Sequence, residues 1–117
     1  MVTATVVKDP SGYVSFECSG HAGFMKKGRD IVCAAISILT INTANSIMTL
    51  TDTKIHVDEN DGFISWKFED RPGEAATLLM DSLLIGLRSV EEDYKGYLTL
   101  RIEEVRDVKV KPSVICS

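Results

Sequence analysis

The chain has 117 residues, with 13 basic and 17 acidic side chains and a formal net charge of -4 at pH 7. This length predicts a single domain with its own core, which we expect to cover residues 1–108, followed by a flexible tail over 109–117. The negative charge argues against direct nucleic-acid binding, which needs a basic face. We expect no targeting segment and no contact with a membrane, because no apolar run reaches spanning length.

Three cysteines, Cys18, Cys33 and Cys116, occur without the spacing of a disulfide framework. An odd number of thiols fits a reducing compartment, so we expect a cytoplasmic protein without a structural disulfide. The acidity suits a basic partner, although such mild acidity is common among proteins and carries little weight.

The first predicted elements are two strands that form a hairpin. Residues 2–7 and 13–18 alternate in polarity, and the intervening Asp9-Pro10-Ser11-Gly12 is a strong turn sequence. In the second strand the alternation predicts a shared buried face made by Val14, Phe16 and Cys18.

A glycine-bearing loop over residues 19–29 leads into a long predicted helix. The helix extends from about residue 31 to residue 49, where apolar residues leave little room for a polar face. Asp30 directly precedes this run and is a favourable N-cap residue. We expect the helix to be central and buried on most sides.

A second hairpin is predicted from residues 54–57 and 63–68, which flank the turn sequence Asn60-Asp61-Gly62. In its second strand, one face carries Ile64, Trp66 and Phe68. His56 lies between two residues that are expected to face inward, so we expect its side chain to face solvent.

A second helix and a last strand complete the predicted order. Pro72 suits a helix start, and the helix extends to about Asp93, with inward positions at Leu79, Leu83, Leu87 and Val90. After Lys95-Gly96, apolar residues alternate with polar ones from residue 98 to residue 102. The order ββαββαβ predicts an α+β fold, with an antiparallel or mixed sheet packed with two helices, rather than a doubly wound parallel sheet.

The loop and the helix start contain a histidine and a cysteine in the layout of a nucleophile and its base. Gly20-His21-Ala22-Gly23 places an imidazole on a glycine-bearing loop, and Cys33 falls at the start of the following helix. A helix N-terminus favours the thiolate form of a cysteine, and a histidine can accept its proton. The separation in sequence does not give a distance in space, but the loop is able to fold back over the helix end.

The same helix start offers a site for an oxyanion. Backbone N–H groups in a first helical turn lack helical acceptors, which suits the charge of a tetrahedral intermediate. Ser37 lies one turn after Cys33, so its hydroxyl either supports the thiolate or bonds to its own helix backbone. We favour the second role for Ser37.

These residues resemble the signature of the bacterial ribosomal-processing cysteine proteases, the Prp family. The resemblance rests on Gly20-His21-Ala22-Gly23, on its spacing to Asp30-Ile31-Val32-Cys33-Ala34-Ala35, and on Ser37, and length and element order agree over nearly the whole chain. It implies a homodimeric protease that removes a short N-terminal extension from a large-subunit ribosomal protein, cutting after two phenylalanines. It also implies that His21 and Cys33 form the catalytic dyad, with Gly20, Asp30 and Ser37 as supporting positions.

The sequence also allows a metal site and an acidic docking patch to be considered. Cys18, His21 and Cys33 have the beginnings of a metal-ligand spacing, but a closed zinc site needs four ligands and the strand alternation turns Cys18 into the core. We therefore expect neither a metal nor a cofactor. The acidic residues 91–93 are read as a solvated helix end, or else as a docking patch for a basic substrate.

Together the sequence predicts a cysteine endopeptidase that acts on a ribosomal protein precursor, in which Cys33 attacks the carbonyl and His21 accepts and then returns the proton. The alternative is a noncatalytic ribosome-assembly factor that binds a basic segment of a ribosomal protein. The thiol at a helix start beside a histidine-bearing loop favours the enzyme, because a binding module has no need of it.

Overall fold

The computed structural model describes residues 1–20 and 29–106, with the side chains of the second range described from residue 31. The elements follow the order β1 (Val2–Asp9), β2 (Gly12–Ser19), α1 (Arg29–Leu50), β3 (Ile55–Asn60), β4 (Phe63–Phe68), α2 (Glu74–Asp93) and β5 (Leu98–Glu104). The predicted tail over 109–117, which contains Cys116, lies outside the described residues, as does the loop over 21–28.

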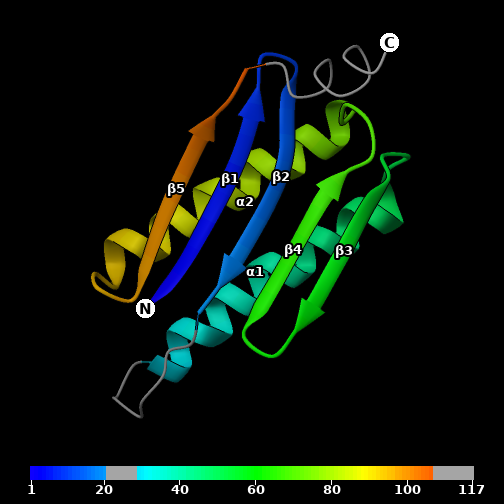
Figure 1. Cartoon of the computed structure of the whole chain (residues 1–117). Coiled ribbons are helices and arrows are strands. Elements are labelled where there is room, and N and C mark those ends of the chain that lie inside the picture. The colour runs from blue at the N-terminus through cyan, green and yellow to red at the C-terminus, as the bar shows by residue number, and fades with distance from the viewer. Residues whose placement is uncertain (21–28, 107–117) are drawn as a thin grey trace.

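The strands form one sheet in the order β3-β4-β2-β1-β5. Neighbouring strands are antiparallel except for β1 and β5, which are parallel. Both helices lie on the same face of this sheet (Figure 1). The expected α+β fold, a mixed sheet packed with two helices, is therefore confirmed. Parallel pairing of β5 with β1 needs a long crossover, which α2 supplies.

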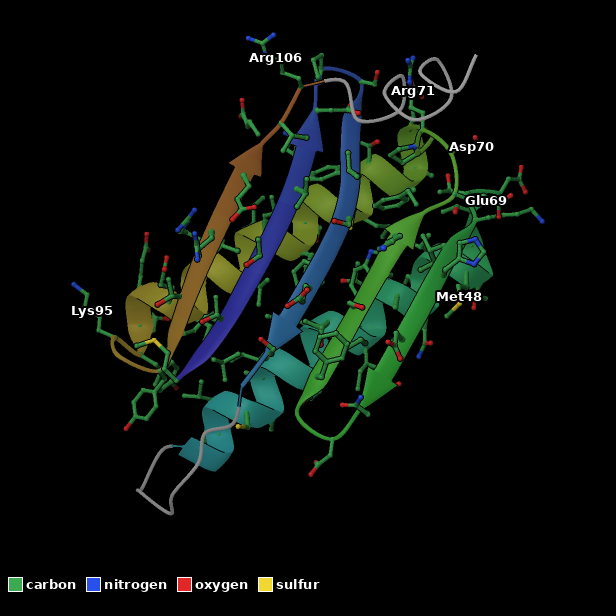
Figure 2. The ribbon with its side chains drawn as sticks, in the orientation of Figure 1. Met48, Glu69, Asp70, Arg71, Lys95 and Arg106 are labelled. Atoms are coloured by element: carbon green, nitrogen blue, oxygen red, sulfur yellow. The ribbon has the colours of Figure 1, made fainter. Side chains whose placement is uncertain are left out.

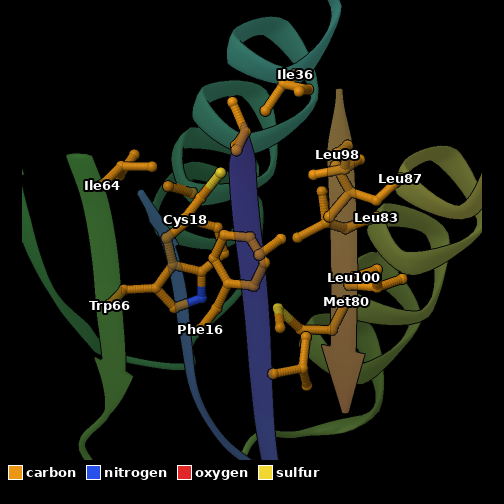
Figure 3. Close-up of a cluster of buried hydrophobic side chains, with 14 of the residues drawn as sticks. Phe16, Cys18, Ile36, Ile64, Trp66, Met80, Leu83, Leu87, Leu98 and Leu100 are labelled. Atoms are coloured by element: carbon orange, nitrogen blue, oxygen red, sulfur yellow. The ribbon is translucent and has the colours of Figure 1, made fainter. Parts of the chain in front are cut away.

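The core lies between the sheet and the two helices. Trp66 of β4 and Phe16 of β2 are fully buried, with ring centroids 4.7 Å apart. Figure 3 shows these rings beside Cys18 and Ile64, and β5, at one edge of the sheet, adds Leu98 and Leu100 to the same core. Of the predicted face of β4, Ile64 and Trp66 are buried and Phe68 packs against the core.

The buried face of β2 differs from the predicted one at its beginning. Phe16 and Cys18 are buried as expected, but the side chain of Tyr13 is buried in place of Val14. The pairing with β1 shifts between Val7 and Lys8, which leaves Val14 as an extra residue. Such a bulge reverses the alternation of the strand beyond it.

The inward Tyr13 links the sheet to α2. Its hydroxyl donates a hydrogen bond to the carboxylate of Asp81. Burial, and then this hydrogen bond, raises the pKa of Tyr13, so the hydroxyl remains a neutral donor. The bulge therefore brings a polar group to a place where α2 provides its acceptor.

The first helix is longer and more exposed than the sequence predicted. One stripe of α1 packs on the sheet, with Val32, Ile36 and Ile47 buried. Its far side is open, since Ile31 is 62% exposed and Ile38 is 67% exposed. The expectation that this helix is buried on most sides was wrong, because the two helices form a single layer that nothing else in the described chain covers.

The apolar character of α1 also corrects another expectation. Residues 31–50 of α1 are a 20-residue stretch with a mean hydropathy of 1.7, long and apolar enough by length and composition to cross a membrane. Interspersed Thr, Asn and Ser residues interrupt each apolar run, which hides the length of this segment in the sequence. In the structure, 33% of this apolar stretch is buried inside the protein.

The second hairpin extends further than predicted. Its first strand runs from Ile55 to Asn60, and the turn is made by Asp61 and Gly62, with a φ of 76° at the glycine. Only glycine adopts that conformation without strain. The side chain of His56 is 71% exposed, as expected, and lies 3.3 Å from a carboxylate oxygen of Glu69. Glu69 belongs to the charged connection after β4, where Figure 2 labels residues 69–71.

The end of α2 is held by an acidic side chain. Glu91 accepts a hydrogen bond from the backbone N–H of Leu100 at 2.9 Å and another from Arg88 at 2.6 Å. These bonds, the backbone one first, lower the pKa of Glu91. Of the acidic residues 91–93, Glu91 is therefore a structural link to the edge strand β5 rather than part of a solvated end.

We predict that Glu91→Gln destabilises the protein by about 1 kcal/mol at pH 7, because the bonds to Leu100 and Arg88 lose their charge assistance. A lowered pKa in the folded state stabilises the protein above the ordinary glutamate pKa of about 4.3, and this contribution disappears as the pH falls through the folded value. Urea unfolding from neutral pH down to about pH 3 measures the difference. The adjacent, exposed Glu92→Gln is the control, and equal stability losses in both variants at pH 7 would contradict the assignment.

Candidate active site

A cavity of about 260 Å³ opens where α1, the end of β2 and the β3–β4 hairpin meet. Three parts of the chain that are far apart in sequence line it. Helix α1 contributes Cys33, Ile36, Ser37, Thr40 and Ile41, the β1–β2 hairpin contributes Val2, Cys18 and Gly20, and the second hairpin contributes residues 59–64.

Cys33 is on the wall of this cavity, partly exposed, between the buried Val32 and the buried Ile36. Ser37 lies one helical turn further along and lines the same cavity. Within the described part of the chain, no hydrogen bond involves the Ser37 hydroxyl, whereas Thr40 does bond to its helix backbone, at 2.9 Å from the carbonyl of Ile36. The thiol and the Ser37 hydroxyl are thus both available to a molecule in the cavity.

The start of α1 differs from the predicted start. The helix begins at Arg29, so Asp30 is its second residue rather than the residue before it, and Cys33 is its fifth. The first four N–H groups of a helix lack helical acceptors, and the amide of Cys33 comes after them. The expected oxyanion site near Cys33 therefore rests on the amides that precede Cys33 in the helix, and the Cys33 amide itself does not contribute. The side chain of Asp30 lies outside the described part.

Gly20 is the last described residue before the loop, and its surroundings require a glycine. Its φ is 114°, and a Cβ atom there would lie 2.5 Å from the backbone oxygen of Met1. Its N–H donates a hydrogen bond to the carbonyl oxygen of Gly62, 3.1 Å away. The backbone of Gly20 is therefore held in a fixed position on the cavity wall. His21, the next residue, lies outside the described residues.

Cys18 is the second thiol on the cavity wall, but it belongs to the core. It is 6% exposed, and Figure 3 shows it between Ile64 of β4 and Ile36 of α1. Burial, followed by the charges of Cys33 and Glu17, raises the pKa of Cys18 to about 11. A thiol with this pKa remains protonated at neutral pH and is a poor nucleophile. Among the described residues, no three metal-ligating side chains gather.

The hairpin wall of the cavity was not predicted from the sequence. The sequence predicts a turn at residues 60–62, but nothing in their spacing indicates that this turn lies beside the N-terminal half of α1. Two carboxylates, Glu59 and Asp61, line the cavity there, and its described lining contains no lysine or arginine. The sheet order, which places β4 next to β2, is what brings this turn beside Gly20.

Comparison with known proteins shows which family the chain belongs to. The sequence profile of the cysteine protease Prp family matches residues 1–99. The chain is 29% identical to the ribosomal processing cysteine protease Prp of Bacillus subtilis, over 84% of this chain and 94% of that protein. It is 30% identical to the protein of the same name from Staphylococcus aureus, over 86% of this chain and 97% of the relative.

Solved structures give the same result for the fold. The S. aureus ribosomal processing protease Prp in complex with a substrate peptide superimposes with a TM-score of 0.81 at 25% identity, covering 88% of this chain and 100% of that one. The same enzyme with a covalently linked product peptide gives a TM-score of 0.79 at 26% identity, with the same coverage. The chain therefore belongs to the Prp family of cysteine proteases.

Proposed function

We propose that this cysteine protease removes the N-terminal extension of a large-subunit ribosomal protein precursor during bacterial ribosome assembly. The relatives from B. subtilis and S. aureus are named as ribosomal processing proteases. The observation that supports the proposal here is that Cys33 and Gly20 line the same cavity. Gly20 directly precedes His21 in the sequence.

In the proposed mechanism, the thiolate of Cys33 attacks the carbonyl carbon of the scissile peptide bond while His21 holds the proton. The tetrahedral intermediate collapses, the C–N bond breaks, and the imidazolium protonates the leaving amine. Water then hydrolyses the thioester with His21 as base, which releases the N-terminal product. Gly20 fixes the start of the loop, and Asp30 and Ser37 are supporting residues for the dyad.

The proposed location is the cytoplasm. Both cysteines in the described part of the chain, Cys18 and Cys33, are free thiols, which is the form that a reducing compartment preserves. A nucleophilic thiol must remain reduced to act, so the chemistry and the compartment agree.

We also propose that the protein is a homodimer, associated through the outer helix face, which we define as Ile31 and Ile38 of α1 with Leu78 and Ile85 of α2. These side chains are 62%, 67%, 68% and 70% exposed. Each pair is seven residues apart and so lies on one stripe of its helix. No residue from 31 to 50 is charged, which makes the outer side of α1 unlike an ordinary solvated surface.

A second copy of the chain suits this face. A layer of two helices about 30 Å long and about 20 Å wide has a flat area on the order of 600 Å². The uneven surface of the side chains makes the accessible area larger. Stable dimers bury about 800 Å² on each partner. Two such layers related by a two-fold axis would bury both apolar stripes against each other.

We predict that Cys33→Ala abolishes cleavage of a precursor peptide, by roughly a thousandfold or more, because the other thiol of the cavity, Cys18, is buried and stays protonated at neutral pH. The matched control is Cys18→Ala in the same cavity, which should cost about 1 kcal/mol of stability and retain turnover. Peptide products are measured by mass spectrometry. Full activity of Cys33→Ala would contradict the assignment, whatever Cys18→Ala does. Peptide binding without cleavage by the wild type would favour the assembly factor.

Alkylation should distinguish the two described thiols. We predict that iodoacetamide modifies Cys33 well before Cys18 between about pH 7 and pH 9, because the raised pKa of Cys18 leaves it protonated over that range and its side chain is buried. Peptide mapping of the native protein gives each rate. The order of reaction should persist until the pH approaches 11, the value for Cys18. Faster modification of Cys18 would contradict the predicted difference.

The dimer proposal predicts that Ile38→Lys combined with Ile85→Lys produces a monomer that retains its helix content, because two cations would be buried at the interface. Sedimentation velocity measures the mass. Val105→Lys, an apolar-to-cation change at an exposed residue away from the helices, is the control and should remain dimeric. A wild-type protein that sediments as a monomer at tens of micromolar would refute the proposal.

A further inference from the structure

The hairpin segment Glu59–Phe63, which we call the turn wall, forms a continuous side of the cavity that holds Cys33. All five of its residues line the cavity. The carbonyl of Gly62 holds the N–H of Gly20 at 3.1 Å, which fixes the turn wall to the end of β2. The turn wall is therefore part of the site and not a loop that happens to lie near it.

The strand register decides which side chains of β3 face the cavity. Glu59 pairs with Ile64, which pairs in turn with the buried Cys18, so Glu59 is on the helix-covered side of the sheet. The preceding residue, Asp58, pairs with Ser65 and points to the opposite side. Of these two neighbouring carboxylates, Glu59 therefore lines the cavity and Asp58 does not.

The charges of the turn wall are one-sided. Glu59 and Asp61 are both exposed, and neither forms an ion pair with any described residue. The rest of the described cavity lining consists of apolar residues, the two thiols, and uncharged polar groups. A substrate segment that occupies the cavity meets two negative charges and no positive charge from these residues.

We infer that Glu59 and Asp61 select substrates with a lysine or arginine side chain close to the scissile bond. This inference rests on the proposed function, because it assigns the turn wall a role in the same cleavage by Cys33. A cation placed beside two partly solvated carboxylates gains a modest, salt-sensitive attraction. A negatively charged side chain in the same place is repelled.

Acidic residues on an edge strand also have a simpler role, which is to prevent pairing with another chain. Asp58 serves that role as well as Glu59 does, because both are on the exposed edge strand β3. Comparison of the two residues therefore separates substrate selection from protection of the edge.

The test uses the full chain and peptides that span the precursor junction, in which lysine, norleucine or glutamate is placed in turn at the three positions on each side of the scissile bond. The variants are Glu59→Gln, Asp61→Asn, both together, and Asp58→Asn as the control. Asp61→Asn preserves the turn, since Asn-Gly is a favoured hairpin sequence. Melting temperatures confirm that each variant is folded.

At one or more positions, wild-type kcat/KM should favour lysine over norleucine, and each single variant should lower this preference by about twofold to fivefold. The double variant should lose it, 1 M salt should suppress it in the wild type, and Asp58→Asn should keep it. The inference is overturned if the wild type cleaves all of the peptides without a charge preference, or if Asp58→Asn changes the preference as much as Glu59→Gln does. A wild type that cleaves none of the peptides contradicts the proposed function instead.

Discussion

The packing of one stripe of α1 on the inner face of the sheet is the constraint on which the site depends. Val32, Ile36 and Ile47 are buried in this contact, and the positions of these residues set the rotation of the helix. Cys33 follows Val32 and lies to one side of this buried stripe on the helix, so its thiol is at the edge of the contact, partly exposed and on the cavity wall. A rotation of α1 by one residue would bury the thiol in the core or turn it to the open side of the helix. The energy that orients the Cys33 thiol is therefore hydrophobic burial, which acts along the whole helix.

The other walls of the cavity are placed by the sheet. Strand β2 lies between β1 and β4, so the end of β2, the start of β1 and the β3–β4 turn meet at one corner. Gly20 occupies that corner, with its N–H bonded to Gly62 and no room for a side chain beside Met1. Cys18, two residues earlier, is drawn into the core, which separates the two thiols into one that packs and one that can react.

Much of the fold could be predicted from the sequence, because periodicity and turn residues are local signals. The two hairpins, both helices and the last strand were expected in the observed order, and Phe16, Trp66 and Leu83 were placed in the core. The errors arose where a partner outside the segment decides the outcome. The bulge that exchanges Val14 for Tyr13 depends on β1 and on Asp81, and the exposure of α1 depends on how many layers the protein has. The bond from Leu100 to Glu91 and the turn wall at Glu59 join residues that no sequence spacing relates. Cys33 could be singled out because its motif consists of two short segments close in sequence, whereas the opposite wall of the cavity comes from a distant hairpin.

The central claim is that Cys33 forms a covalent bond to the substrate in this cavity. The most direct measurement is the intact mass of the enzyme after rapid acid quenching during cleavage of a precursor peptide, followed by peptide mapping of any adduct. The account predicts a thioester whose added mass equals that of the N-terminal product less one water, located on Cys33 and absent from Cys33→Ala. An adduct on Cys18 or on another residue, or complete turnover by Cys33→Ala, would contradict it.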